Sequence, residues 1–286
     1  MGRGTEFGRV ALVTGCSSGF GLLTSIALAK QGYVVVASMR RPEAQGALLE
    51  AARVAGVESS IVVKGMDVRN EEQVTSVVQQ ISECYGRLDV LVNNAGEALG
   101  GLIEEIPLSV WREQMETNFI GMVCVTKAVL PLMRANNSGR IIQLSSISGE
   151  VGFPGFGPYA SSKFAVEGFS ECLALEVKPF GIDVVLIQPG AYGTPIWDKG
   201  FSSMSSQADS PYQELLKSIL NYSKRSAENA GNPMEVAKLV ARIVAMKSPA
   251  FRYRTPFGTR VTMLAKRGLP ERWFQRMILK LLARKS

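Results

Sequence analysis

The sequence predicts an α/β fold in which one doubly wound parallel sheet is covered by helices on both faces. Short apolar runs rich in Val, Ile and Leu recur along the chain, as in parallel strands that are buried on both faces. Longer stretches typical of helices separate these runs, and such alternation indicates right-handed βαβ crossovers. The 286 residues suffice for a single domain of this kind.

The expected elements follow in chain order. Strands are predicted at residues 10–14, 33–37, 61–63, 88–92, 140–144 and 183–188. Helices are predicted at residues 20–31, 43–55, 71–85, 108–134 and 159–179. Because ligands bind at the carboxyl ends of the strands in such sheets, functional residues are expected directly after each strand.

Composition excludes several classes of protein. The chain contains no histidine, which excludes Ser-His-Asp hydrolases and metal sites with histidine ligands. Its four cysteines form no CxxC pair, so neither a disulfide framework nor a zinc knuckle is indicated. They suit a reducing compartment, and a cytoplasmic location is expected.

The positive charge is concentrated near the C-terminal end. The chain has 32 lysines and arginines against 25 acidic residues. Residues 250–286 carry ten of these cations and one acidic residue, Glu271. The rest of the chain is therefore slightly acidic, which argues against a nucleic-acid-binding surface across the fold.

A glycine-rich turn follows the first predicted strand and begins the first helix. The sequence from Thr14 to Gly21 reads TGCSSGFG, which suits either a dinucleotide site or a plain strand–helix turn. Glycines let the backbone approach a pyrophosphate, and the N-terminus of the helix offers N–H donors. The residues of this turn that are predicted to bind the cofactor are Gly15, Ser17, Ser18, Gly19, Phe20 and Gly21.

Two arginines, Arg40 and Arg41, follow the second strand. A fold that selects NAD(H) usually places an acidic residue here to bind the ribose 2′-hydroxyl. Guanidinium groups instead suit a 2′-phosphate, so NADP(H) is expected in preference to NAD(H). The alternative is that these are solvated loop arginines.

Small and polar residues close the next two strands. Asp67 and Val68 follow the third strand, and Asn94, Ala95 and Gly96 follow the fourth. Small residues at these positions let the backbone pass beside a nucleotide. The motif NNAG alone would be only a turn.

Tyr159 and Lys163 are four residues apart and share one face of a predicted helix. A nearby ammonium is expected to lower the pKa of the phenol, which would make Tyr159 an acid–base group near neutral pH. A Tyr/Lys pair is also common on helix surfaces, but Ser145-Ser146 at the end of the fifth strand adds a hydroxyl neighbour.

Together these residues resemble the short-chain dehydrogenase/reductase family over roughly residues 8–200. The resemblance implies a Rossmann-like fold and catalysis by Asn118, Ser146, Tyr159 and Lys163. In this reaction hydride passes between the nicotinamide and a carbonyl carbon while Tyr159 transfers the proton. Ser146 would hold the carbonyl oxygen, Lys163 would bind the nicotinamide ribose, and Asn118 would steady a water.

The resemblance also implies further contacts with the cofactor. Asp67 corresponds to the residue that contacts adenine in the family. Pro189, Gly190 and Thr194 match the PGxxxT motif, whose threonine meets the nicotinamide carboxamide.

The expected function is that of an NADP(H)-dependent oxidoreductase that interconverts a carbonyl and an alcohol on an apolar substrate. The run FRYRTPFG after the last predicted strand is most similar to retinol- and hydroxysteroid-type members. Family members pair their long helices, so the resemblance implies a homodimer or homotetramer. The alternative is a non-catalytic protein that senses NADP(H) on the same fold.

One domain, residues 8–249, is expected to hold the cofactor and catalytic sites. Its residues 191–230 are the expected substrate loop, while residues 250–286 form a basic extension packed on the same domain. The opening MGRGTEF resembles the translation of adjacent cloning sites, so residues 1–7 are excluded from the predicted fold. The apolar contacts of the substrate loop are expected from Tyr192, Trp197, Phe201, Met204 and Tyr212.

Two features depart from the common pattern. Glu97 follows NNAG where similar sequences carry an apolar residue, and it faces either solvent or the substrate pocket. Residues 270–284 are predicted to form a basic amphipathic helix, with Arg272, Arg276, Lys280 and Arg284 at steps of four. Such a helix either lies on an anionic membrane surface or caps the fold or a subunit interface.

Overall fold

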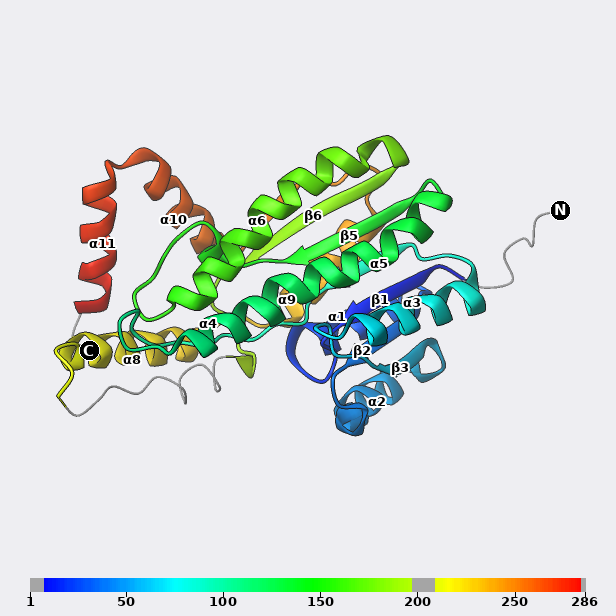
Figure 1. Cartoon of the computed structure of the whole chain (residues 1–286), viewed down its shortest axis with the longest axis horizontal. Helices are drawn as coiled ribbons and strands as arrows, with labels where there is room; N and C mark the ends of the chain where they lie inside the picture. The colour runs from blue at the N-terminus through cyan, green and yellow to red at the C-terminus, as the bar shows by residue number, and fades with distance from the viewer. Residues whose placement is uncertain (1–7, 197–208, 284–286) are drawn as a thin grey trace.

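The computed structural model describes residues 8–196 and 209–283, and these residues form a seven-stranded parallel sheet flanked by helices (Figure 1). The order of the strands is β3-β2-β1-β4-β5-β6-β7, so the chain reverses direction across the sheet between β1 and β4. This is the Rossmann-like, doubly wound arrangement that the sequence predicts. The strands are β1 (Val10–Thr14), β2 (Val34–Met39), β3 (Ile61–Gly65), β4 (Val90–Asn93), β5 (Gly139–Leu144), β6 (Ile182–Pro189) and β7 (Arg252–Thr255).

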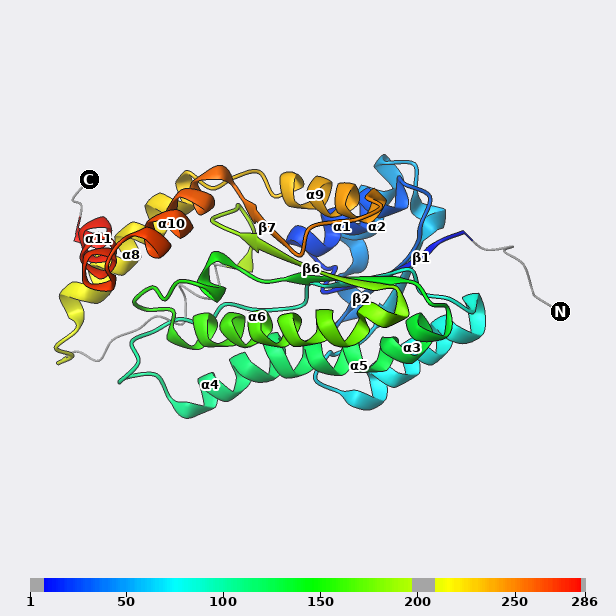
Figure 2. The same ribbon diagram turned by 90° about the horizontal axis from the view of Figure 1, so that it is seen from above.

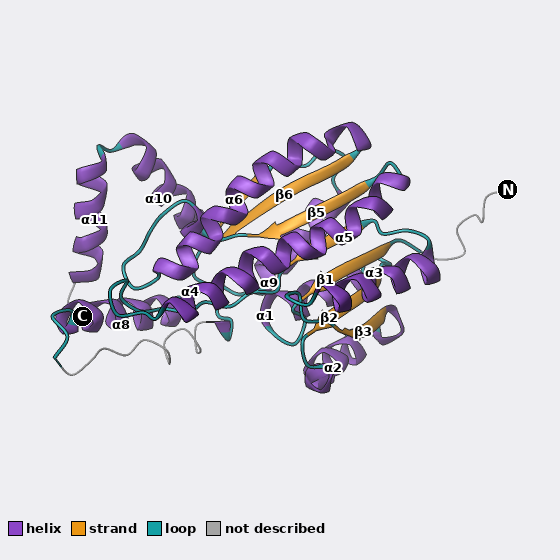
Figure 3. Ribbon diagram, in the orientation of Figure 1, coloured by secondary structure: helices purple, strands orange, loops and turns teal. Residues whose placement is uncertain are grey.

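Helices cover both faces of the sheet (Figures 2 and 3). On one face lie α1 (Gly19–Ala29), α2 (Gly46–Val54) and α9 (Met234–Ala245), and their apolar side chains share one core with the sheet. The other face is covered by α3 (Glu71–Tyr85), α5 (Gly121–Ala135) and α6 (Gly157–Val177). The helix α4 (Leu108–Met115) leads into α5 through a π-helical turn, Glu116–Ile120.

Successive residues of β1 supply opposite cores, as the pleat of a strand requires. Ala11 and Val13 pack on the side of α1 and α9, whereas Val10 and Leu12 pack on the side of α3 and α5. All four side chains are fully buried. This two-sided burial explains why the strand sequences are continuously apolar rather than alternating.

The stretch from α4 to α5, Leu108–Ala135, is long and apolar enough to cross a membrane, and it alone passes this test within the described residues. In the fold it runs along the sheet beside α6 (Figure 2). Its residues Val125, Val129 and Met133 are fully buried in the core. Packing against the sheet therefore accounts for the apolar side chains on the inner side of this segment.

The C-terminal segment forms an arm beyond the carboxyl ends of the strands (Figures 1 and 2). After β7, the chain continues as α10 (Phe257–Gly268) and α11 (Glu271–Ala283). The inner side of α11 packs against α8 (Gln213–Glu228), which follows the expected substrate loop. The predicted tail helix is thus confirmed as an element, and the expected homo-oligomer stays a prediction that light scattering can check.

Candidate active site

The turn after β1 is built so that two backbone segments touch. Gly15 and Gly19 have φ of 73° and 57°, a left-handed conformation that favours glycine. A Cβ on Gly21 would lie only 2.3 Å from the carbonyl oxygen of Gly15, and one on Gly15 would lie 2.8 Å from the Cα of Ala95. Neither position accepts a side chain without displacing backbone.

The loop after β4 is fastened to this turn. The Nδ2 of Asn94 donates to the carbonyl oxygens of Thr14 (2.8 Å) and Gly15 (3.0 Å). In return, the Oγ1 of Thr14 accepts the N–H groups of Asn94 (3.0 Å) and Ala95 (2.9 Å). The predicted NNAG motif therefore locks the loop at the point where the order of the strands reverses.

A cleft runs along the carboxyl ends of the strands, with the N-terminus of α1 on one side and α6 on the other. The exposed backbone of the glycine-rich turn and the N-terminus of α1 fit the pyrophosphate of a dinucleotide. The predicted residues that line the cleft are Gly15, Ser17, Ser18, Gly19, Phe20, Arg40, Asp67, Val68, Asn94, Ala95, Gly96, Ser146, Tyr159, Lys163, Pro189, Gly190 and Thr194.

Three predicted residues lie outside the lining of the cleft. Gly21 is buried beneath the turn, where it permits the close packing described above. Arg41 is exposed at the start of a short 3₁₀ turn, and its role as a cofactor ligand stays a prediction. Of the two arginines after β2, only Arg40 lines the cleft. Asn118 also lies outside the lining.

Asp67 has a partner that the sequence analysis missed. The guanidinium of Arg69 forms an ion pair of 2.6 Å with this carboxylate. The hydrogen bond from Arg69 holds the pKa of Asp67 below its usual range. Both residues line the cleft, so a cofactor meets an anchored ion pair here rather than an isolated carboxylate.

The predicted catalytic side chains meet at the end of β5. Tyr159 and Lys163 lie on the buried face of α6 and are 5% and 6% exposed. The hydroxyl of Tyr159 forms a hydrogen bond with Ser146, and the Nζ of Lys163 donates to the carbonyl oxygen of Leu144 (2.7 Å). The same Nζ lies 5.7 Å from the centre of the Tyr159 ring.

The expected direction of the Tyr159 pKa shift is wrong for this structure. Burial raises the pKa of Tyr159 above its ordinary value, and the hydrogen bond with Ser146 only opposes that rise. Burial lowers the pKa of Lys163 to about 8, against the opposing negative charge of Glu167. Spacing in the sequence showed the ammonium but could not show how completely both groups are withdrawn from water. The phenol therefore holds its proton at neutral pH.

Asn118 lies in the π-helical turn between α4 and α5. Its Oδ1 accepts the N–H of Glu97 (2.9 Å), and its Nδ2 donates to the carbonyl oxygen of Glu97 (2.9 Å) and to the Oγ of Ser162 (3.1 Å). These contacts join the loop after β4 to α6. The role of Asn118 in steadying a water stays a prediction.

Glu97 is half-buried and lines the cleft, and a role of its carboxylate toward substrate stays a prediction. Its carboxylate accepts a hydrogen bond from the Oγ1 of Thr117 (3.1 Å), which also lines the cleft. An acidic side chain therefore lines the cleft at this position.

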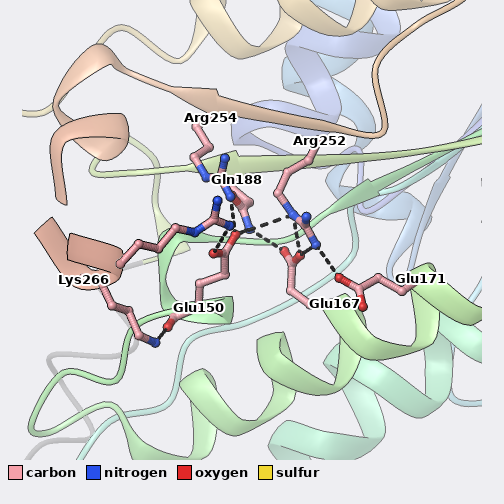
Figure 4. Close-up of polar contacts among 8 residues, drawn as sticks. Glu150, Glu167, Glu171, Gln188, Arg252, Arg254 and Lys266 are labelled. Carbon is pink, nitrogen blue, oxygen red and sulfur yellow. Dashed lines mark hydrogen bonds and ion pairs between the residues drawn. The ribbon is translucent and has the colours of Figure 1, made fainter. Parts of the chain in front are cut away.

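A cluster of largely buried charged side chains connects α6 with the neighbouring strands (Figure 4). Glu167, one turn after Lys163 on α6, accepts hydrogen bonds from Gln188 (2.9 Å) and from the Nη2 of Arg252 (2.8 Å). Glu150 accepts from Gln188 (2.6 Å) and from Arg254 (2.7 Å). This cluster is not predictable from the sequence, because its members lie on four separate segments of the chain.

The expected substrate loop is described in part. Tyr192 is 2% exposed, and its ring packs edge-on against Phe20 at 5.6 Å between centroids. The hydroxyl of Tyr212 donates to Glu104 (2.5 Å). Trp197, Phe201 and Met204 lie outside the described residues.

Comparison with known proteins places this site in a family. Residues 9–204 match the model of the short chain dehydrogenases. The chain belongs to the short-chain dehydrogenase family. It is therefore an oxidoreductase of carbonyl and alcohol groups that uses a nicotinamide cofactor.

Relatives match this protein along most of their length. The uncharacterized oxidoreductase YusZ of Bacillus subtilis is 43% identical over 265 residues, which cover 92% of this chain and 94% of that protein. The 3-ketodihydrosphingosine reductase of Bacteroides thetaiotaomicron is 40% identical, with coverage of 93% and 95%. Retinol dehydrogenase 8 of Bos taurus is 37% identical, with coverage of 90% and 83%.

Solved structures agree with the fold. A short-chain dehydrogenase from Streptomyces avermitilis superposes with a TM-score of 0.79 at 30% identity, covering 96% of both chains. A variant of the actinorhodin polyketide ketoreductase with NADPH gives a TM-score of 0.75 at 33% identity, covering 88% of this chain and 97% of its own.

Proposed function

We propose that this protein is an NADP(H)-dependent oxidoreductase that interconverts a carbonyl and a secondary or primary alcohol on an apolar substrate. The observation that carries the proposal is the buried group of Ser146, Tyr159 and Lys163 beside a cleft that fits a dinucleotide. Such a group supplies a proton donor, a hydroxyl to hold an oxygen and a cation at one point.

The chain itself supplies binding and a proton, while hydride comes from the nicotinamide ring when the cofactor is bound. The hydroxyls of Ser146 and Tyr159 bind the carbonyl oxygen, and Tyr159 donates its proton as negative charge develops there. Because burial keeps the phenol protonated, Tyr159 begins a reduction with its proton in place. The cation of Lys163 then stabilises the phenolate that remains, and oxidation of an alcohol reverses these steps.

An apolar substrate is supported by the relatives and by the surroundings of the site. Two of the similar proteins are named for a ketodihydrosphingosine and for retinol. Beyond the carboxyl ends of the strands, Leu102, Leu216 and Ile219 form a buried apolar cluster against which Phe156 packs.

The test is a screen for oxidation of NADPH with long-chain ketones, 3-keto sphingoid bases, steroids and retinoids. With the best substrate, Tyr159→Phe should lower turnover by at least ~10² while binding of NADPH persists, because only the proton donor is lost. Tyr85→Phe, at the far end of α3, is the matched control and should keep normal turnover. Near-normal turnover of Tyr159→Phe across about pH 6 to 9 would contradict the assignment of the acid.

The preference for NADP(H) rests on Arg40, which lines the cleft at the end of β2 where no acidic residue stands. The dissociation constant for NADPH should be at least ~tenfold below that for NADH, a difference of ~1.4 kcal/mol. Arg40→Asp should narrow or reverse this ratio in titration calorimetry. Arg41→Asp changes the charge equally but lies outside the cleft, so it should leave the ratio unchanged. Similar constants for both cofactors in the original protein would contradict the preference.

A further inference from the structure

We propose that the outer face of the C-terminal arm, formed by α10 and α11, docks on the surface of an anionic lipid bilayer. The proposal goes beyond the reaction proposed above and does not depend on it. It rests on which side chains of the arm face the protein and which are left exposed.

The two sides of α11 have different surroundings. Phe274, Ile278 and Leu282 are 6–7% exposed and pack inward against the rest of the chain. Arg272 and Arg276, at successive turns, are exposed on the opposite side. Most of the apolar arc of this helix is therefore covered by protein, and the basic stripe lies on its exposed side.

Large apolar side chains stand exposed among the cations of the arm. Trp273 (65% exposed) and Leu279 (54% exposed) flank the basic stripe of α11 on either side. On α10, Leu264 is 71% exposed and Val261 is 52% exposed, next to the exposed Arg260. A solvated charged face does not need such residues, and their grouping on one arm marks an interaction surface.

The charge of the arm selects the partner. Residues 257–283 carry six cations and one acidic residue. Lys266 donates to the carbonyl oxygen of Glu150, whereas Arg272, Arg276 and Lys280 make no ion pair or hydrogen bond with any other described residue. Free cations with an interspersed tryptophan and leucines suit the boundary between lipid phosphates and acyl chains. A nucleic acid would use the cations and leave these apolar side chains in water.

A hollow on the arm is lined both by cations and by apolar side chains. The described residues that line it are Leu269, Trp273, Arg276, Met277, Lys280 and Leu281, and its volume is about 450 Å³. Four of these lining residues are apolar and two are cations. This combination fits an anionic headgroup above the first methylenes of its chains.

The inner side of the arm contacts the catalytic region. Met263 of α10 and Phe274 of α11 pack with Val151, in the segment that follows Ser146. Leu282 of α11 packs with Leu216 of α8. A docked arm would therefore hold the substrate side of the protein against the bilayer, where an apolar substrate is concentrated.

The experiment is co-sedimentation with vesicles of phosphatidylcholine alone or mixed with phosphatidylglycerol. The protein should pellet with the mixed vesicles and stay soluble with the neutral ones, and ~0.5 M salt should release it because the Debye length falls to ~4 Å. The triple variant Arg272→Gln/Arg276→Gln/Lys280→Gln should lower the partition coefficient at least ~tenfold. Trp273→Ser alone should lower it ~3-fold or more, because the interfacial anchor is lost.

The matched control removes three exposed cations elsewhere, in Lys30→Gln/Lys127→Gln/Lys238→Gln, and should bind vesicles as the original protein does. Substitution is preferred to deletion, because loss of α11 would uncover Phe274 and its neighbours. Circular dichroism and NADPH binding verify that both triple variants are folded. Equal binding by both triple variants, or binding of duplex DNA with no binding of mixed vesicles, would overturn the proposal. A failure here leaves the reductase assignment intact, since that assignment is read from NADPH oxidation.

Discussion

The arginines of β7 and the cations of α11 come from one basic segment of the sequence. The arginines of β7 pair with carboxylates inside the protein, whereas the cations of α11 are exposed. Arg252 and Arg254 have side chains that are 19% and 20% exposed, and each pairs with a carboxylate of the body, Glu167 or Glu150. Arg272 and Arg276 are exposed on the outer face of the arm. Net charge alone therefore does not reveal the role of a basic segment, because its cations divide between internal pairing and external contact.

Periodicity explains this division. Residues 252 and 254 are two apart in a strand, so both side chains point to the same face of the sheet, toward α6 and the segment after Ser146. Residues 272 and 276 are four apart in a helix and share the side away from the core. The same residue type is thus buried or exposed according to the element that carries it.

The largest expected effect is on stability and follows from removal of the internal ion pair between Arg252 and Glu167. Arg252→Leu leaves the carboxylate of Glu167 buried without its cation, and we expect a loss of ~3 kcal/mol in the free energy of unfolding. Arg272→Leu makes the same chemical change on the outer face and should alter stability by no more than ~0.5 kcal/mol. Urea denaturation of both variants measures the difference. Equal losses of unfolding free energy in the two variants would show that the cations of β7 and α11 contribute equally to stability.

A smaller effect is expected on the pKa of Lys163, which lies one turn before Glu167 on α6. The negative charge of Glu167 raises the pKa of Lys163, which burial has lowered to about 8. Glu167→Gln removes that charge, so Lys163 should lose its proton at lower pH. Since the proposed mechanism uses the protonated amine, the alkaline fall in kcat/KM should move to lower pH, and pH profiles of the variant and the original protein measure this change.

Glu171→Gln is the matched control for this pH profile. Glu171 also pairs with Arg252 (2.9 Å), but its side chain is 60% exposed. Replacement of Glu171 should leave the alkaline fall of kcat/KM at the same pH. If Glu167→Gln also leaves this fall at the same pH, Glu167 supports α6 structurally and does not tune Lys163.

The sequence was sufficient to predict the strands whose residues are buried on both faces. The predicted strand 10–14 and helix 71–85 coincide with β1 and α3, and the other predicted strands fall within two residues of β2 to β6. β7 was missed because an edge strand with Arg252 and Arg254 lacks the apolar run on which the prediction relied. The π-helical turn at Asn118 was missed because it barely disturbs the apolar pattern of the long helix.

The candidate site was predictable where a short motif carries it. The glycines, Asn94, Tyr159 and Lys163 were found because their spacing is local. Glu167 and Arg252 could not be found in this way, because their partners lie on distant segments of the chain. Arg69 stands only two residues after Asp67, but no motif singled out this pair. The direction of the pKa shift of Tyr159 was also predicted wrongly because it depends on the three-dimensional fold. Spacing specifies neighbours along a helix but not the depth of burial.

Glu150 connects the arm, through hydrogen bonds, to the segment that carries the catalytic serine. Its side chain is held by Gln188 and Arg254 from two strands, while its carbonyl oxygen accepts Lys266 of α10. Ser146, which hydrogen-bonds to the proton donor, lies only four residues before it along the chain. The arm and the segment that follows the catalytic serine are therefore joined by a polar contact as well as by the apolar packing of Met263 and Phe274 on Val151.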